Sequence, residues 1–366
     1  MKRISKTSAA LVAGTVLINF APAQTPPAGQ AASRDVNRFG VAYRMMFNVS
    51  VDFKDLGGYP LPAGVNPGPP TGFQADRVYE DGYNRLDDNL NSYGDLHATR
   101  YWGYDRDSGP NSQVIDTAGS RFVEMHATSS EGGESSKGIA EDPQHGFEIT
   151  YNRELQDREA WRWGLEAAMG YTPFGVDDNR PRAGDVTRLS DRFEVPLDEE
   201  TGTRYVPPAP YRGAQSEGPL LGSEPMRTIS TIVGGAAVTG KRDFSADIFG
   251  FRLGPYLEFP LGKQGAITLS GGLALVFVSS DFSYTETVAI AGLNPLTRSG
   301  SGSDSDLQLG GFVAGNFSCK LGENWGAFAG AQFQSAEDYA HKESGKKTIL
   351  RLGQTVFVSV GVNYSF

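Results

Sequence analysis

The final twelve residues of the chain, Thr355 to Phe366, alternate between apolar positions and small or polar positions. Counted back from Phe366 in steps of two, the residues are aromatic or valine, and the residues between them are small or polar except for Phe357. Successive side chains of a strand point to opposite faces, so this pattern predicts a β-strand with one apolar face. Its length is that of a strand crossing a bilayer at a tilt.

The same alternation recurs along the chain, at residues 39–53, at 147–171 and most densely after Met226. Turns or loops are expected at 240–243, 299–305 and 337–347, and weaker strands at 97–105 and 120–128. Two Gly- and Pro-rich stretches, 55–96 and 173–225, are predicted to be long loops. The clear strands number about eleven, and a barrel with both termini on one side needs an even number. A hidden strand is therefore predicted near residues 186–197.

The start of the chain has the pattern of a secretory signal peptide at residues 1–23. A basic stretch precedes an apolar run at 9–20, which Ala21-Pro22-Ala23 follows, and the run is too short to span a membrane as a helix. The mature chain is expected to begin near Gln24, with a flexible lead-in at 24–35 and a single domain at 36–366. An uncleaved anchor is the alternative.

Composition narrows the class of protein. No later stretch has eighteen consecutive apolar residues, which argues against a transmembrane helix. The single cysteine, Cys319, excludes an intrachain disulfide. The formal net charge is −10, and removing the signal peptide removes three basic residues and no acidic one. This acidity argues against nucleic acid as a partner.

The closing strand, with its alternating pattern and terminal Phe366, resembles the C-terminal signal of Gram-negative outer-membrane β-barrel proteins. The resemblance implies an all-β fold, an antiparallel up-and-down transmembrane β-barrel, located in the outer membrane. It also implies contact with membrane lipid and lipopolysaccharide, and recognition of the strand ending at Phe366 by the barrel-assembly machinery. The strand count predicts about twelve strands, with ten or fourteen as alternatives.

Parity along the strands predicts which side chains face the lumen and which meet the membrane surface. Charged residues on the inner face are expected to line the lumen: Arg44, Asp52, Glu124, His126, Glu148, Arg162, Glu166, Arg252 and Glu258. Structural pairing of these charges is favoured over an open channel, because a narrow barrel has a small lumen. Aromatic residues at strand ends are expected at the lipid interface: Tyr43, Trp102, Trp161, Trp163, Tyr171, Trp325, Tyr364 and Phe366.

Catalytic and metal-binding motifs do not emerge from the sequence. The four histidines fit no zinc spacing, and neither a G-x-S-x-G nor a phosphate-binding loop is present, so no cofactor or metal is expected. Outer-membrane phospholipases also resemble twelve-stranded barrels, but their histidine lies on the outer wall, whereas His126 is predicted to face inward. The expected function is a porin-like channel or a surface structural or adhesion protein. A barrel phospholipase or protease and a secreted soluble β-protein are the alternatives.

Overall fold

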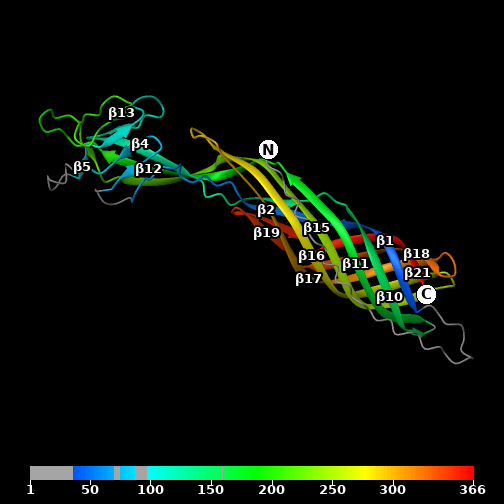
Figure 1. Cartoon of the computed structure of the whole chain (residues 1–366). Coiled ribbons are helices and arrows are strands. Elements are labelled where there is room, and N and C mark those ends of the chain that lie inside the picture. Colours follow the sequence, from blue (N-terminus) through cyan, green and yellow to red (C-terminus); the bar gives the residue numbers. More distant parts are fainter. Residues whose placement is uncertain (1–35, 70–74, 88–96, 159) are drawn as a thin grey trace, which may run out of the picture.

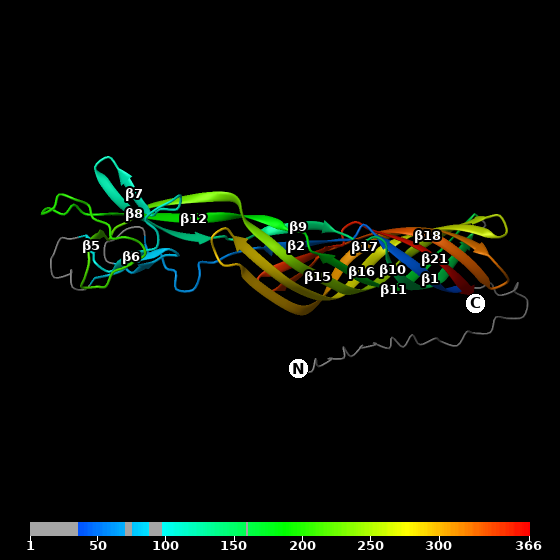
Figure 2. The same cartoon turned by 90° about the horizontal axis from the view of Figure 1, so that it is seen from above.

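The computed structural model describes residues 36–69, 75–87, 97–158 and 160–366, and within these ranges every regular element is a β-strand. The predicted signal peptide and lead-in lie outside the described residues. Among the residues that are described, no helix is long and apolar enough to cross a membrane. The molecule is elongated, with a tube of strands at one end and a small group of short strands at the other (Figures 1 and 2).

The tube is a closed ring of antiparallel strands, and each strand pairs with the next around the ring. The ring closes where the final strand pairs with the first, with Val362 opposite Val41. We name the end of the ring that carries Asn37 and Ser365 the base. The eight strands of the ring, in chain order, are β1 (Asn37–Phe47), β10 (Gln144–Arg158), β11 (Trp161–Asp178), β15 (Met226–Leu261), β16 (Gly265–Ile290), β17 (Leu296–Lys320), β18 (Trp325–Ala336) and β21 (Thr355–Ser365).

This confirms the all-β antiparallel barrel, whereas the predicted count of about twelve strands is not confirmed. The expected turn at 240–243 lies inside β15, and the expected loop at 299–305 lies inside β17. The outward positions of these two segments are polar, with Lys241 and Asp243 in the first and serine at 299, 301, 303 and 305 in the second, so the segments have the composition of loops although they are strands. Gly240 allows close strand contact, because a Cβ there would lie 2.0 Å from the carbonyl oxygen of Thr285.

Above the ring, the long strands continue as one wall of a sandwich. The second wall is a four-stranded sheet in the order β19 (Tyr339–Glu343), β20 (Lys346–Arg351), β2 (Ser50–Leu56) and β9 (Glu134–Ile139). The single strand expected at 39–53 is split between β1 and β2 at Asn48, whose φ is 60°. This change of direction takes the chain from the ring into the second wall, and Figure 1 shows β2 and β19 beyond the ring.

A narrow neck joins the sandwich to the group of short strands, which we name the head. The neck consists of β12 (Arg182–Glu194) and residues 226–238 of β15, which pair with each other. The hidden strand predicted near 186–197 is thus present, although it lies outside the ring. The head contains β3 (Arg77–Val78), β4 (Gly82–Asn84), β5 (Ala98–Thr99), β6 (Trp102–Tyr104), β7 (Val114–Thr117), β8 (Ser120–Ser129), β13 (Tyr211–Arg212) and β14 (Leu221–Gly222).

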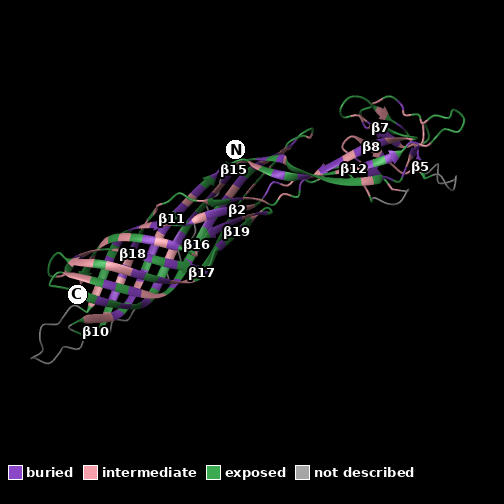
Figure 3. Cartoon of the chain, turned by 180° about the vertical axis from the view of Figure 1, so that it is seen from behind, coloured by how far each residue is buried: buried purple, intermediate pink, exposed green. Residues whose placement is uncertain are grey.

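The outside of the ring is apolar, and exposed and buried residues alternate along its strands (Figure 3). Leu273, near the middle of this surface, is 66% exposed. On β11, outward-facing aromatic residues stand at Trp161 and Tyr171. Ten residues at ~3.4 Å each and a tilt of ~45° span about 24 Å, which is close to the height of the apolar band on membrane barrels.

Candidate functional site

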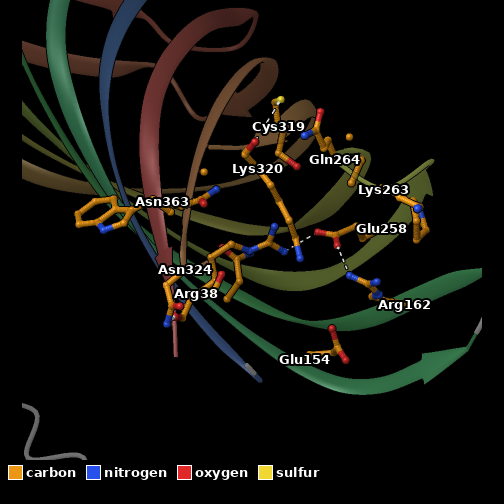
Figure 4. Close-up of a pocket in the computed structure, with 18 of the residues that line it drawn as sticks. Arg38, Glu154, Arg162, Glu258, Lys263, Gln264, Cys319, Lys320, Asn324 and Asn363 are labelled. Atoms are coloured by element: carbon orange, nitrogen blue, oxygen red, sulfur yellow. Dashed lines mark hydrogen bonds and ion pairs between the residues drawn. The ribbon is translucent and has the colours of Figure 1, made fainter. Parts of the chain in front are cut away.

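The lumen of the ring begins at the base with a shallow pocket of about 160 Å³, shown in Figure 4. At its inner side the carboxylate of Glu258 accepts hydrogen bonds from Arg38 at 2.5 Å and from Arg162 at 3.2 Å. Thr268 adds a hydroxyl donor at 3.3 Å. These residues come from β1, β11, β15 and β16, so the contacts cross the lumen. Predicted residues Arg162 and Glu258 are therefore brought together, and Arg38 joins them.

A second layer of charges lies deeper in the ring, beyond a cavity of about 40 Å³. Glu148 forms ion pairs with Arg44 and Arg252, both at 2.8 Å, and Arg252 also contacts Glu166 at 3.3 Å. All four predicted residues are buried. Gly170 leaves room for this layer, because a Cβ there would lie 2.6 Å from Nη1 of Arg44. Two arginines and two glutamates thus fill the lumen with balanced charge.

Aromatic rings cover this charged layer on the side away from the base. The guanidinium carbon of Arg44 lies 3.3 Å from the ring centre of Phe357, and that of Arg252 lies 5.2 Å from the ring centre of Phe312. Phe357 belongs to a buried apolar cluster that both walls of the sandwich contribute to, with Phe53 from β2 and Phe282 from β16. An aqueous path through the lumen would have to cross this apolar cluster.

A buried ionic cluster lies at the far side of the sandwich. Arg242 pairs with Asp178 at 3.2 Å and with Glu286 at 3.3 Å, and Lys346 pairs with Glu286 at 2.8 Å. Lys346 also donates to the carbonyl oxygens of Asp55 and Gly57. Each of these four side chains is at most 5% exposed. The cluster ties the loop after β2 to strands of the opposite wall, a structural role.

Most predicted interface aromatics stand in two rows on the outer surface of the ring. The upper row crosses four neighbouring strands through Phe147, Tyr171, Phe249 and Phe277, whose successive ring centres are 5.6, 5.0 and 6.3 Å apart. At the base, Trp325 lies 5.2 Å from Tyr364, and Tyr364 lies 6.4 Å from Phe366. Tyr43, Trp161 and Trp163 also lie on ring strands, facing outward.

Trp102 is the exception, because the prediction placed it at a lipid interface. It lies on β6 in the core of the head and is fully buried. Its ring centre is 4.7 Å from that of Tyr211, and its indole nitrogen donates to the carbonyl oxygen of Pro219 at 2.8 Å. An aromatic residue on a β-strand gives the same sequence pattern whether lipid or protein covers it, which explains the error.

Three of the predicted lumen residues lie outside the ring. Asp52 is on β2, where it pairs with Arg351 at 2.8 Å and accepts the backbone N–H of Gly138 at 2.9 Å. Glu124 and His126 are on β8 in the head, so their placement in the lumen was wrong. Glu124 and His126 do share one face of β8, as the alternation predicted. Alternation within a strand does not reveal which sheet the strand joins.

His126 lines a pocket of about 530 Å³ beside the neck. Its Nδ1 lies 2.6 Å from Asp81, and its Nε2 lies 2.9 Å from Glu124. Burial lowers the pKa of His126, but the hydrogen bond and charge of Asp81 and the hydrogen bond to Glu124 together hold the pKa above its ordinary value. Burial raises the pKa of Glu124, but Arg192 and His126 together bring it below its ordinary value.

The pocket has no donor set for a metal. Within the described ranges, no group of three or more His, Cys, Asp or Glu side chains is placed to hold a metal ion. Both ring nitrogens of His126 are engaged by carboxylates. A general base needs a free ring nitrogen to accept a proton, so this arrangement favours an ion-paired histidine over a catalytic one.

Sequence reasoning missed Arg38, Phe312 and Phe357 as lumen residues. The sequence did mark Phe357 as unusual, because it is the one aromatic residue on the polar face of the closing strand. Its place beneath the apolar cluster explains the exception. Arg38 lies just before the first apolar position of its strand and gave no comparable signal.

No protein-family model matches the chain, and no curated protein matches it. Three solved structures to which it is similar are Ail, the attachment invasion locus protein of Yersinia pestis, the outer-membrane protease OmpT of Escherichia coli, and the toluene transporter TodX of P. putida. Ail is 11% identical over 67% of this chain and 93% of its own, with a TM-score of 0.27. OmpT is 12% identical over 92% of this chain and 99% of its own, with a TM-score of 0.27. TodX is 7% identical over 91% of this chain and 91% of its own, with a TM-score of 0.16. At these values the likenesses do not place the chain in a family, and the fold rests on the strand pairing.

Proposed function

We propose that this chain is an outer-membrane surface protein that displays its head outside the cell and does not conduct solutes. The observation that carries the proposal is the filled lumen, in which the layer of Arg44, Glu148, Glu166 and Arg252 lies directly against the apolar cluster. The interior of a ring of eight strands is just wide enough for side chains. The porin-like alternative from the sequence is therefore the less favoured of the two.

The membrane location is supported by the apolar outer surface and its two aromatic rows. An apolar band of this height would be unfavourable in water, which argues against a secreted soluble protein. Outer-membrane lipid and lipopolysaccharide are the partners that such a surface fits. The barrel-assembly machinery is a further proposed partner, through β21, which ends beside Phe366 and closes the ring against β1.

The orientation follows from the proposed targeting of the strand that ends at Phe366, which places the base in the periplasm and the head outside. The turns at the base are short, as at 262–264, whereas the opposite end carries the sandwich, neck and head. Short periplasmic turns and long outer segments are typical of outer-membrane barrels. The engaged ring nitrogens of His126 support a role without catalysis.

Planar-bilayer conductance of the full chain tests the closed lumen. We expect no current above background, with an open porin in the same bilayers as the positive control. Steady single-channel currents from the purified protein would contradict the closed lumen and leave the membrane location intact.

An epitope tag tests display separately. A tag at Gly202, in an exposed turn beyond the neck, should bind antibody on intact cells. The matched control is a tag at Lys263, in the short turn at the base, which should bind antibody only after permeabilisation. The reverse result would overturn the orientation.

A further inference from the structure

The neck carries a strand with one unpaired edge. Residues 226–232 of β15 pair with β12 on one side. On the other side, pairing with β16 begins only at Ala236, which lies opposite Ile290. Over 226–235, the part of the structure that is described provides no strand on this second side. We name residues 226–235 the open edge.

Residues 228–233 of the open edge lack the charged residues and prolines that often protect an edge strand. Natural sheets block such edges with lysine, proline, covering loops or short strands, because unpaired N–H and C=O groups are a template for another strand. Between Arg227 and Lys241 the sequence contains no charged residue and no proline. Isoleucine, valine and threonine dominate residues 228–233, and these residues favour strands.

The side chains of the open edge are also uncovered. Ile229 is 65% exposed, Ile232 is 45% exposed and Val233 is 84% exposed. Ile229 and Val233 lie on one face of the strand and Ile232 on the other. An added strand would therefore bury apolar surface on both faces in addition to pairing the backbone.

A bulge limits the usable length of the open edge. The register between β12 and β15 shifts between Gly184 and Val186, and the N–H of Gly234 donates to the side chain of Asp185 at 3.0 Å. Gly234 has a φ of 67°. Bulges bend and twist a strand, so the edge available for pairing is the segment 226–233, which has regular register with β12 as far as Ile232 and ends before Gly234.

The direction of β15 decides between a second copy and a different polypeptide. β15 runs without interruption from the neck into the ring, so all copies in one membrane have their open edges pointing the same way (Figure 1). Two such edges could pair only as parallel strands, which is the less stable arrangement. A segment from another polypeptide can enter in the antiparallel direction.

We infer that residues 226–233 of β15 bind an extended, uncharged segment of another polypeptide, which adds to the neck as an antiparallel strand. Main-chain hydrogen bonds supply the affinity in this mode of recognition, and alternate apolar side chains supply selectivity. The segment is uncharged because the one charged residue of the open edge, Arg227, is already paired with Asp191 at 2.6 Å. It carries apolar residues at every second position to cover Ile229 and Val233. The choice of another polypeptide over a second copy rests on the proposed membrane location, whereas the open edge itself rests on the exposure and pairing of the neck and not on the state of the lumen.

The test measures binding of a fluorescent synthetic peptide, four Thr-Val repeats with a lysine at each end, to the full chain in detergent. The matched control peptide has proline in place of each valine, which removes every second backbone N–H donor and disfavours a paired strand. We expect the first peptide to bind and to slow amide hydrogen exchange within residues 226–233. The double variant Ile229→Lys, Val233→Lys should weaken binding by about tenfold or more, because edge lysines block strand addition. Leu197→Lys, at an exposed apolar position away from the edge, should bind like the parent.

Three results would overturn the inference. The first is that the peptide stays free at millimolar concentrations of the full chain, and the second is that the double variant binds it as tightly as the parent. The third is self-association of the parent that the double variant abolishes, which would make a second copy the occupant.

Discussion

The ring and the head are built from the same kind of strand, but their surfaces are reversed. In the ring, Leu273 is exposed and Arg252 is buried, whereas in the head Trp102 is buried and Arg212 is exposed. The hydrophobic effect acts in the head as in any water-soluble domain. In the ring, the reversal is stable only if lipid covers the outside and charge pairing satisfies the inside. The surrounding solvent therefore decides which face of a strand must be apolar.

The sandwich between them shows where the reversal ends. Its apolar cluster lies inside, as in the head, yet its strands are continuations of ring strands. Along β15, inward residues change from Arg252 to Ile248 and Phe244, and outward residues change from Leu253 and Phe249 to Asp247 and Asp243. Along this one strand, the apolar side chains thus change from the outward face in the ring to the inward face in the sandwich.

The largest effect is expected from the core of the head. Trp102→Ala should destabilise the head by about 3–5 kcal/mol, the usual cost of removing a large buried aromatic side chain. Hydrogen exchange should show the loss in head amides, while the heat-modifiable gel migration of the ring stays unchanged. Trp325→Ala, on the exposed base row of the ring, is the control and should leave head exchange at the level of the parent. Equal loss in the two variants would mean that the head is not an independent core.

Introducing a charge on the outer surface of the ring tests whether lipid covers that surface. Leu273→Arg should cost about 2–4 kcal/mol of unfolding free energy in lipid vesicles, because a charge near the bilayer midplane is costly. Leu197→Arg, at a similarly exposed leucine beyond the neck, should stay within about 0.5 kcal/mol of the parent. Denaturant unfolding in vesicles measures both, and indistinguishable values would argue that water rather than lipid covers Leu273.

The smallest expected effect is the pH dependence of the head. The pKa of His126 is raised above 6.5 despite burial, so its stabilising contribution is complete below that value and is lost as the pH rises through the folded pKa. The pKa of Glu124 is lowered below 4.5, so its contribution is complete above 4.5 and is lost in acid. Between these limits the head should exchange its amides most slowly.

Amide exchange of the head at pH 5.5 and pH 8, corrected for intrinsic rates, measures this dependence. His126→Gln should remove most of the difference between the two pH values. His145→Gln, on β10 in the ring, should retain it. Retention of the full difference by His126→Gln would assign the pH dependence to another group of the pocket, such as Glu80, whose pKa is raised by burial.

Much of the ring could be predicted from residue order. Period-two alternation identified the strands carrying Arg44, Glu148, Arg162, Glu166, Arg252 and Glu258 and their inward faces, because parity is a local property. The head could not be predicted in the same way. Its core joins Val123 and Phe193 from longer strands to Trp102 and Leu221, which come from strands of three and two residues, and strands so short give no periodicity.

The sequence by itself determined that the chain forms long amphipathic strands, that the closing strand has one apolar face, and that charges of both signs share the opposite face. Only the tertiary structure decided how many strands close the ring, which charges meet, and that Phe357 joins an apolar cluster across the lumen. The physical reason is that alternation fixes the face of a side chain within one strand. Register and closure are set by contacts between strands that are distant in the chain, and those contacts leave no local pattern.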